Sequence, residues 1–338
     1  MNLELSPCIS KSGRIMTIRN TGKTILWIIA SVFCAAHVSA QDFPNRPVKI
    51  VVGYPPGGAV DANARILGQL LSEHWKQPVV IENRGGAGST IGTGTVARSP
   101  ADGYTLLLAS PAHAINATLY KNLTFDTATA FAPVAKISLA PLVLLLHPSV
   151  QAQSVAQLIA LAKAQPGKLN YGSSGVGTSV HLAGALFNMM AGTSMQHIPY
   201  QGGGPAITAL LAGDTQLMFA GIEGLAHAKA GKLRALAITS AQRAELFGDI
   251  PTIAESGLPG FDVESWYGLY APAATPQSVV AQISQATNQV LKTTAAIERF
   301  RKLGFEVFQS TPEQFSAFNQ SELKRWREVI QSARATLD

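Results

Sequence analysis

The chain has 338 residues, of which 47% are hydrophobic and 14% charged, a composition that excludes an intrinsically disordered protein and allows a large core. Its formal charge of +6 is concentrated at the start: four basic residues and one acidic residue lie in the first 40 positions, and the remainder carries 22 basic and 19 acidic residues. No basic cluster interleaved with aromatic residues occurs, which argues against nucleic acid as a partner.

The first 40 residues are typical of a secretory signal peptide. A basic stretch precedes an apolar run over 24–36, and Val38-Ser39-Ala40 is a small-x-small cleavage site. Either Met1 or Met16 fits as the start. Both cysteines, Cys8 and Cys34, lie in this segment. We therefore expect an exported mature chain that begins at position 41, without disulfides and without a further membrane span.

The segment 48–75 combines a strand, a glycine-containing loop and a helix. Residues 48–52 form an almost unbroken β-branched apolar run, which predicts a parallel strand covered on both faces. Apolar residues at helical spacing predict a helix over 62–75. Gly57 and Gly58 lie between them, and the first amides of a helix have no partner within it. This loop is therefore a candidate seat for an anion, with an ordinary βα turn as the alternative.

The same pattern of strand, small-residue loop and helix recurs along the chain. We predict strands over 78–83, 104–110, 141–148, 168–172, 195–200, 216–220 and 233–239, and helices over 93–98, 155–164, 180–191, 205–211, 276–293 and 312–335. Strands that alternate with helices at this spacing indicate an α/β fold with doubly wound, mostly parallel sheets.

Four loops share one character, since each follows a strand, precedes a helix and is rich in glycine or hydroxyl residues. They cover 54–61, 84–92, 173–179 and 200–204. In open α/β sheets such loops lie at the carboxyl ends of the strands, where ligands bind. A carboxylate held there can receive several hydrogen bonds from amides and hydroxyls. Four similar loops therefore favour a binding site for a small carboxylate.

Motifs for enzymes are weak. Gly92-x-Gly94-x-x-Ala97 matches the dinucleotide fingerprint but falls within a predicted helix. The run 172–175 resembles a nucleophile elbow, although Val176 replaces the glycine that the elbow needs. An exported hydrolase that uses Ser174 with His181, or Ser110, stays as the alternative function. The seven histidines lack ligand spacing, so we expect neither a metal nor a cofactor.

Several single residues have two interpretations. Tyr200 and Trp266 are either core aromatics or walls of a cleft, and their positions beside candidate loops favour the cleft. Arg84 is either a partner for an anion or a solvated loop charge. Asp61 lies close to a helix N-cap and either contacts the ligand or stabilises its own helix.

Beyond these local patterns, the sequence resembles one family over essentially the whole mature chain: the periplasmic solute receptors of tripartite tricarboxylate transporters, or Bug family. The matching motifs occur in the family's order, at Tyr54-Pro55-Pro56-Gly57-Gly58 with Asp61, at 82–88, 101–105 and 171–175 with His181, at 197–202, 251–257 and 266–269. Gln201 and Ser89-Thr90 depart from the residues often found in the family, which bears on the distal half of a ligand.

The resemblance implies a two-lobed Venus flytrap of the type II periplasmic-binding-protein class. One lobe would comprise residues 41–141 and 265–338, and the other residues 142–264. It also implies a monomer that captures an organic acid in the periplasm and serves membrane transporter subunits or, alternatively, a sensor. The candidate ligand-binding residues are Tyr54, Pro55, Gly57, Gly58, Asp61, Arg84, Ser110, Ser173, Ser174, Thr178, Tyr200, Gln201, Gly202, Gly203 and Trp266.

Overall fold

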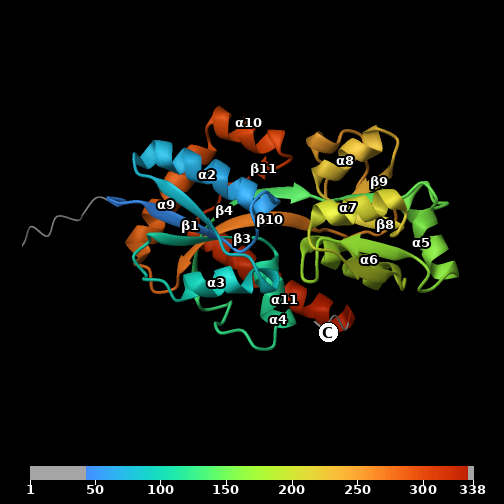
Figure 1. Cartoon of the computed structure of the whole chain (residues 1–338), viewed down its shortest axis with the longest axis horizontal. Helices are drawn as coiled ribbons and strands as arrows, with labels where there is room; N and C mark the ends of the chain where they lie inside the picture. Colours follow the sequence, from blue (N-terminus) through green and yellow to red (C-terminus); the bar gives the residue numbers. More distant parts are fainter. Residues whose placement is uncertain (1–42, 334–338) are drawn as a thin grey trace, which may run out of the picture. The chain divides into compact units, whose positions relative to one another are not determined.

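A computed structural model describes residues 43–333 (Figure 1). The predicted signal peptide and its cleavage site lie outside the described residues. Within 43–333, no helix has the length and apolar character needed to cross a membrane.

Eleven strands and ten α-helices occur in the described chain. The strands are β1 (Val48–Val52), β2 (Val79–Asn83), β3 (Thr105–Ala109), β4 (Phe131–Pro141), β5 (Val143–Leu146), β6 (Asn170–Ser173), β7 (Gln196–Pro199), β8 (Leu217–Ala220), β9 (Arg234–Ile238), β10 (Glu264–Pro272) and β11 (Glu306–Val307). The helices are α2 (Ala59–Trp75), α3 (Thr90–Ala97), α4 (Ala112–Leu119), α5 (Val155–Ala164), α6 (Ser179–Ala191), α7 (Gly203–Ala212), α8 (Ile222–Lys229), α9 (Gln277–Leu291), α10 (Thr294–Lys302) and α11 (Pro312–Ala333), with two short 3₁₀ turns at Ala87–Ser89 and Glu245–Phe247.

The strands form two sheets. The first has the order β11-β4-β10-β3-β1-β2, and the second has the order β7-β6-β8-β5-β9. Strands β3, β1 and β2 are parallel, as are β7, β6 and β8, whereas every other neighbouring pair is antiparallel. The predicted two-lobed α/β fold is confirmed, but each sheet is mixed rather than mostly parallel.

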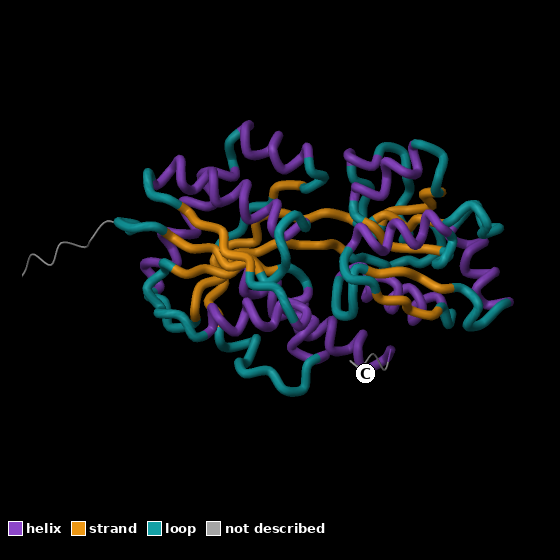
Figure 2. Tube along the Cα trace, in the orientation of Figure 1, coloured by secondary structure: helices purple, strands orange, loops and turns teal. Residues whose placement is uncertain are grey.

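The antiparallel pairs arise from the path of the chain between the two sheets. Strand β4 belongs to the first sheet and is followed, after Leu142 alone, by β5 of the second sheet. The chain returns through β10, which lies beside β4 in the first sheet and runs in the opposite direction. Figure 2 shows the two groups of strands and the extended β4 and β10 segments between them. Strand β4 ends at Pro141 and β10 begins at Glu264, while the lobe boundaries near 141 and 265 stay a prediction.

Strand β1 is buried on both faces, as its apolar run predicts. Ile50 and Val52 belong to one hydrophobic cluster, with residues of α2 and α9, whereas Val51 belongs to the other cluster, with residues of α4 and α11. Because successive side chains of a strand point to opposite faces, a strand between two helical layers needs apolar residues at every position. Strand β1 therefore lies between two helical layers, beside the edge strand β2, with its carboxyl end leading into the first loop.

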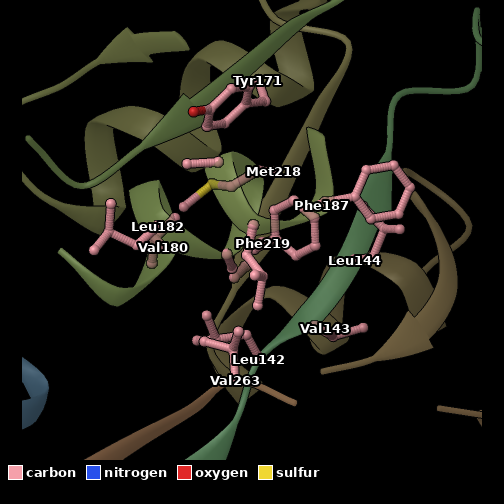
Figure 3. Packing of buried hydrophobic residues seen from close by; sticks show 14 of the residues in the cluster. Leu142, Val143, Leu144, Tyr171, Val180, Leu182, Phe187, Met218, Phe219 and Val263 are labelled. Atoms are coloured by element: carbon pink, nitrogen blue, oxygen red, sulfur yellow. The ribbon is translucent and has the colours of Figure 1, made fainter. Parts of the chain in front are cut away.

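The core around the second sheet is packed from β5, β6, α6 and β8, and it belongs to the same hydrophobic cluster as residues of α4 and α11. Phe187 and Phe219 are fully buried, with ring centroids 6.0 Å apart, and Figure 3 shows them beside Leu144 and Met218. Gly184 lets α6 approach β6 closely, because a Cβ there would lie 2.3 Å from the Tyr171 ring. The strand that carries Ser173 is thereby held against the helix that follows it.

The structure also contains elements that the sequence patterns did not predict. These are α4, α8, α10, the short β11 and the long strands β4 and β10. The helices α2, α3 and α7 begin two or three residues earlier than predicted. Helix α3 has the sequence TIGTGTVA, whose glycines and threonines have low helix propensity. Tertiary packing overrides that propensity, since Val96 is fully buried.

Candidate functional site

The first loop of the first lobe leaves its glycines uncovered. A Cβ placed on Gly57 or Gly58 would meet no heavy atom within 4 Å, and both residues are exposed. Gly58 is the N-cap of α2 with extended backbone angles (φ −85°), and no side chain caps the helix. The amides that open α2 are therefore accessible to an external acceptor, as an anion seat requires.

Asp61 braces this loop from behind. Its carboxylate is 2% exposed and accepts hydrogen bonds from the Gly57 amide at 2.9 Å, the Arg65 Nε at 2.8 Å and the Asn83 Nδ2 at 2.9 Å. Asn83 also donates to the Tyr54 carbonyl at 3.0 Å. Burial alone would raise the pKa of Asp61, but the hydrogen bonds from Arg65, Gly57 and Asn83 together lower it. The Asp61 carboxylate therefore stays charged and holds the loop in shape. Because an ionised carboxylate only accepts hydrogen bonds, it does not itself bind an anionic ligand.

The second loop packs directly on the first. A Cβ on Gly53 would lie 2.5 Å from Ser89 Cβ, and one on Gly85 would lie 3.1 Å from the Pro55 ring. Arg84 is exposed and forms an ion pair with Glu82. The backbone of the second loop therefore lies close to the first loop, while the Arg84 guanidinium is paired with the Glu82 carboxylate.

A hydroxyl pair follows the third strand of the first sheet. Ser110, directly after β3, lies 3.3 Å from the half-buried Tyr54 hydroxyl. Burial raises the pKa of Tyr54, while its contacts with Ser110 and Ser89 act in the opposite direction. Tyr54 is therefore a neutral hydroxyl that can donate one hydrogen bond and accept others.

In the second lobe, the loop after β6 is held by neutral groups. Ser173 Oγ is fully buried, lies 2.6 Å from His197 Nε2 and accepts from the Gly175 amide at 3.1 Å. Thr178 is the N-cap of α6, where its hydroxyl accepts from the His181 amide and donates to the Gly175 carbonyl. Ser173 and Thr178 thus shape the loop around Gly175.

Two histidines stack beneath this loop. The rings of His181 and His197 have centroids 3.9 Å apart, and the Tyr171 ring lies 5.0 Å from that of His197. Burial lowers the pKa of His181 to about 4 and that of His197 to about 3, with the proximity of His181 adding to the second shift. Both rings are therefore neutral at pH 7, and His181 Nδ1 accepts a hydrogen bond from the Gly177 amide at 3.2 Å.

The fourth loop lies beside the third. The Tyr200 amide donates to the Ser173 carbonyl at 3.0 Å, and the half-buried Tyr200 ring lies 3.6 Å from the position of a Cβ on Gly172. Gln201 is exposed. Gly202 has φ +113° and is the N-cap of α7, and a Cβ there would meet nothing within 4 Å. A second uncovered helix start therefore adjoins the third loop.

Asn116 on α4 connects loops of both lobes. Its Nδ2 donates to the Gly88 carbonyl at 2.6 Å, and its Oδ1 lies 3.1 Å from the position of a Cβ on Gly177. The residue is 3% exposed, and Oδ1 has no hydrogen-bond partner within 43–333. Loops 84–92 and 173–179, which were predicted separately from the sequence, therefore both lie beside Asn116.

Trp266 lies in the core rather than at the loops. It is 1% exposed, its indole donates to Glu322 at 2.8 Å, and its ring packs against Phe315 and Phe318. The Trp266 side chain is therefore a core residue and does not line the loops. Two cavities, of about 520 Å³ beside α8 and β9 and of about 200 Å³ beside Lys136, are also lined by none of the predicted residues. The candidate site is thus defined by the donors of its loops.

The arrangement offers neutral donors rather than charges or a nucleophile. The cations beside the first loop, Arg65 and Arg84, are paired with Asp61 and Glu82. The described residues contain no group of three or more His, Cys, Asp or Glu side chains able to hold a metal ion. No hydrogen bond joins Ser174 to His181 in the described part of the chain. The neighbouring Ser173 contacts a different histidine, His197, and is fully buried.

Sequence patterns missed three residues around the site: Asn83, Asn116 and Tyr267. His181 and His197 were interpreted as packing or loop-bracing residues, and His197 does contact Ser173. Asn83 lies within a recognised motif, but its hydrogen bond to Asp61 depends on a neighbouring strand. Asn116 lies on a helix that was not predicted. Tyr267 is buried in β10, and burial followed by the charge of Glu223 and the proximity of Tyr54 raises its pKa. No local sequence pattern distinguishes these residues, because each of them interacts with residues of other helices, strands or loops.

Comparison with known proteins gives consistent results. A family model described as tripartite tricarboxylate transporter family receptor matches residues 63–334. Protein BugT of Bordetella pertussis is 38% identical over 315 residues, which cover 91% of this chain and 96% of BugT. The structure of Rpa4515 of R. palustris with adipate has a TM-score of 0.80 at 35% identity and covers 88% of this chain and 100% of that one. MatC of Rhodopseudomonas palustris with bound malate has a TM-score of 0.76 at 30% identity, covering 85% and 100%.

Proposed function

Because the chain belongs to the tripartite tricarboxylate transporter receptor family, we propose that it binds a small organic carboxylate between the glycine- and hydroxyl-bearing loops of its two lobes. It acts as a solute receptor in the periplasm, after removal of residues 1–40, and delivers its ligand to membrane transporter subunits. The related structures with adipate and malate support a carboxylic acid as the class of ligand.

The observation that carries the proposal is the set of uncovered donors at two helix starts. Gly58 precedes α2 and Gly202 precedes α7, and neither position is covered by any neighbouring heavy atom. The Tyr54 hydroxyl lies in the loop of Gly58, and loop 173–179 adjoins the loop of Gly202 through the hydrogen bond from the Tyr200 amide to the Ser173 carbonyl. The Thr178 hydroxyl in that loop donates to the Gly175 carbonyl. An anion bound by such donors needs no cation, because helix N-termini carry a partial positive charge.

The residues that we assign to the ligand belong to the four loops, together with Ser110, which follows β3. Tyr54, Gly57, Gly58 and Ser110 belong to the first lobe, and Ser174, Thr178, Tyr200, Gln201, Gly202 and Gly203 to the second. Pro55 and Arg84 border the first two loops, whereas Asp61 and Ser173 hold their loops in shape without contacting the ligand.

We further propose that the protein is a receptor and not an enzyme. A serine hydrolase needs a nucleophile within reach of its base and of the substrate. Within the four loops, Ser173 is the serine that contacts a histidine, and it is fully buried and accepts a hydrogen bond from the Gly175 amide. Outside these loops, Ser149 Oγ lies 2.7 Å from His147 Nδ1. Ser174 is accessible but contacts no histidine in the part of the chain described here. The four loops therefore supply binding groups without an accessible activated nucleophile.

Thermal unfolding with a panel of acids tests the proposal. Protein purified from the periplasmic fraction is heated with monocarboxylates, dicarboxylates, citrate, amino acids and aromatic acids. A ligand present at 100 times its dissociation constant stabilises the fold by about 2.7 kcal/mol, which is a readily measured shift. We expect a shift with one chemical group of acids. Mass spectrometry of the same sample tests for a mature N-terminus at Gln41.

Two controls complete the experiment. The protein is first unfolded and refolded, so that a ligand retained from the cell does not mask the shift, and the released small molecules are identified by mass spectrometry. Ester and amide substrates are then supplied to the wild type and to Ser174→Ala. Turnover that disappears in the variant, together with no shift by any acid, would contradict the receptor and favour the hydrolase.

A further inference from the structure

The cavity of about 200 Å³ beside Lys136 lies at the edge of the first sheet, outside the four loops. It is lined by β4, by residues that follow β11 and by the first turns of α11. Hydrogen bonds hold its wall in place: the Phe308 amide donates to the Ile137 carbonyl at 2.8 Å, and the Lys136 amide donates to Ser310 Oγ at 2.8 Å. The cavity is therefore built between anchored segments of the chain.

Among the described residues that line this cavity, Lys136 alone is charged. The residue is 6% exposed, and its Nζ lies 4.4 Å from the ring centroid of Phe308 and 4.2 Å from that of Phe318, two rings that also line the cavity. Within residues 43–333, the ammonium group has no hydrogen-bond or ion-pair partner. The ring faces attract its charge but offer no oxygen to accept its N–H groups. Because a buried charge is costly without such an acceptor, the cavity beside Nζ is suited to an anion.

The acids around Lys136 lie outside the cavity. Burial lowers the pKa of Lys136, and attraction from Glu264, Glu322 and Asp262 opposes that shift. Glu322 accepts hydrogen bonds from two indoles at 2.8 Å and pairs with Arg325, and the Asp262 carboxylate accepts one from a backbone amide at 3.1 Å. Burial raises the pKa of Glu264, which favours its neutral form. None of these three acids lines the cavity, so the charge that faces it is the ammonium of Lys136.

The size and walls of the cavity indicate which anion fits. An apolar cavity of about 150 Å³ accommodates benzene. The volume of about 200 Å³ therefore has room for an aromatic ring that carries one carboxylate. Phe308, Phe315 and Phe318 supply apolar walls, and Phe308 is 40% exposed, as expected for a residue at an open mouth. A second carboxylate would lie among these rings without a partner, which disfavours a dicarboxylate.

We propose that this cavity is a second binding site, which takes a small aromatic monocarboxylate such as benzoate. The carboxylate accepts hydrogen bonds from Lys136 Nζ, and the ring packs against Phe315 and Phe318. Hydrogen bonds between two charged groups are stronger than those between neutral groups, so the ammonium dominates the affinity. The site goes beyond the proposed function, because it shares no residue with the loops between the lobes.

Calorimetry with benzoate and its neutral analogue benzamide tests the proposal, in protein freed of retained ligand by unfolding and refolding. Gly58→Phe, which fills the first ligand loop, is the background in which the cavity is measured by itself. There we expect benzoate to bind at least about 10-fold more tightly than benzamide, a difference of about 1.4 kcal/mol. Adding Lys136→Met, which keeps an unbranched side chain but removes the charge, should abolish that preference and leave the binding of benzamide unchanged.

Two further variants separate the charge of Lys136 from the shape of the cavity. Phe308→Ala removes a ring that is already partly exposed, so the unfolding midpoint should change little. It should weaken benzoate and benzamide alike, by about 3- to 10-fold, because both lose an aromatic contact. Lys168→Met removes an exposed charge in the second lobe and should alter neither affinity.

The outcomes distinguish this site from the proposed function. Benzoate affinity that Lys136→Met leaves unchanged, or no binding of benzoate at all, would overturn the second site. Benzoate binding that Gly58→Phe abolishes would overturn it as well, because the benzoate would then lie at the loops. The proposed function is tested separately, by acids whose binding Gly58→Phe removes and Lys136→Met does not.

Discussion

The loops of the two lobes expose the same kind of donor but are held in shape by different chemistry. In the first lobe, a buried carboxylate, Asp61, ties the Gly57 amide to Arg65 and Asn83. In the second lobe, a serine hydroxyl and a neutral imidazole do the equivalent work at Ser173 and His197. One loop therefore depends on a charge and the other depends on the absence of charge.

This difference shows how an anion site is built without a cation facing the ligand. The Asp61 carboxylate is already satisfied by three donors, so its negative charge is directed into the protein. The histidines under the other loop stay neutral because burial disfavours their charged form. Both arrangements leave backbone amides as the free donors, and the two lobes should respond differently to substitution and to pH.

The largest effect is expected when a bulky side chain fills either loop. Gly58→Phe and Gly203→Phe should each weaken ligand binding by at least about 100-fold, or about 2.7 kcal/mol, because the ring would occupy the space in front of the amides. A Cβ on Gly58 meets nothing within 4 Å, and one on Gly203 meets only Glu223 at 3.9 Å, so the unfolding midpoint should change little. Calorimetry and thermal unfolding measure the two quantities.

Gly58→Ala is the matched control, because it adds a Cβ alone and should cost far less affinity. If Gly58→Phe binds as the wild type does while Gly203→Phe does not, the two loops are not equivalent and the first does not hold the ligand.

The next effect concerns stability and separates the charged loop from the neutral one. Asp61→Ala should lower the free energy of unfolding by about 2 kcal/mol, because hydrogen bonds to a buried charged group contribute about 1.5–3 kcal/mol. Ser173→Ala should cost about 1 kcal/mol, since its partners are neutral. Arg65→Ala, at an exposed partner of Asp61, should cost less than either. Urea unfolding measures all three, and equal losses for Asp61→Ala and Ser173→Ala would contradict the distinction.

Much of this organisation could be predicted from the sequence. The apolar run at β1 predicted a strand buried on both faces, and the recurring small-residue loops predicted the starts of α2, α3, α6 and α7 to within three residues. Those signals are local, because the spacing of apolar residues and the residues at a helix start are found within a short stretch of sequence. The family motifs added the order of the two lobes.

What sequence patterns missed depends on contacts between distant segments. Trp266 adjoins a motif and was expected at the cleft, but Glu322, 56 residues further on, accepts its indole hydrogen bond and draws it into the core. Asn116 lies on a short helix whose pattern is weak, and its role comes from loops on either side of it. The antiparallel strands likewise follow from the return of the chain through β10, which no local pattern encodes.

Acid should weaken the second-lobe loop before the first. His181 and His197 have folded-state pKa values of about 4 and about 3, below the value of about 6.5 in the unfolded chain. The unfolded state therefore binds more protons below pH 6.5. The stability that these residues contribute is complete above pH 6.5 and is lost as the pH falls toward 4 and then 3, by up to about 1.4 kcal/mol per pH unit for each histidine.

The lowered pKa of Asp61 places the corresponding loss in the first lobe below about pH 3.9, the ordinary range of a carboxyl group. Urea unfolding and ligand affinity are measured from pH 7.5 to 4. His197→Gln should flatten both curves. His113→Phe is the control, because burial also lowers the pKa of His113 to about 3, but its ring lies between Phe131 and Tyr270 and contacts no ligand loop. It should flatten the stability curve alone, and the same effect on affinity would contradict a local role for the His181–His197 pair.

The smallest effect is expected at the residue that joins the two lobes. Asn116→Ala removes a hydrogen bond to the Gly88 carbonyl, while the Oδ1 that it also removes has no partner within the described residues, so the loss of stability should be about 1 kcal/mol. Affinity should fall by about 3- to 10-fold, since loops 84–92 and 173–179 lose their common contact. Thr118→Ala on the same helix is the control and should change neither. If Asn116→Ala lowers stability but leaves affinity unchanged, the two loops are positioned independently, each by the network of its own lobe.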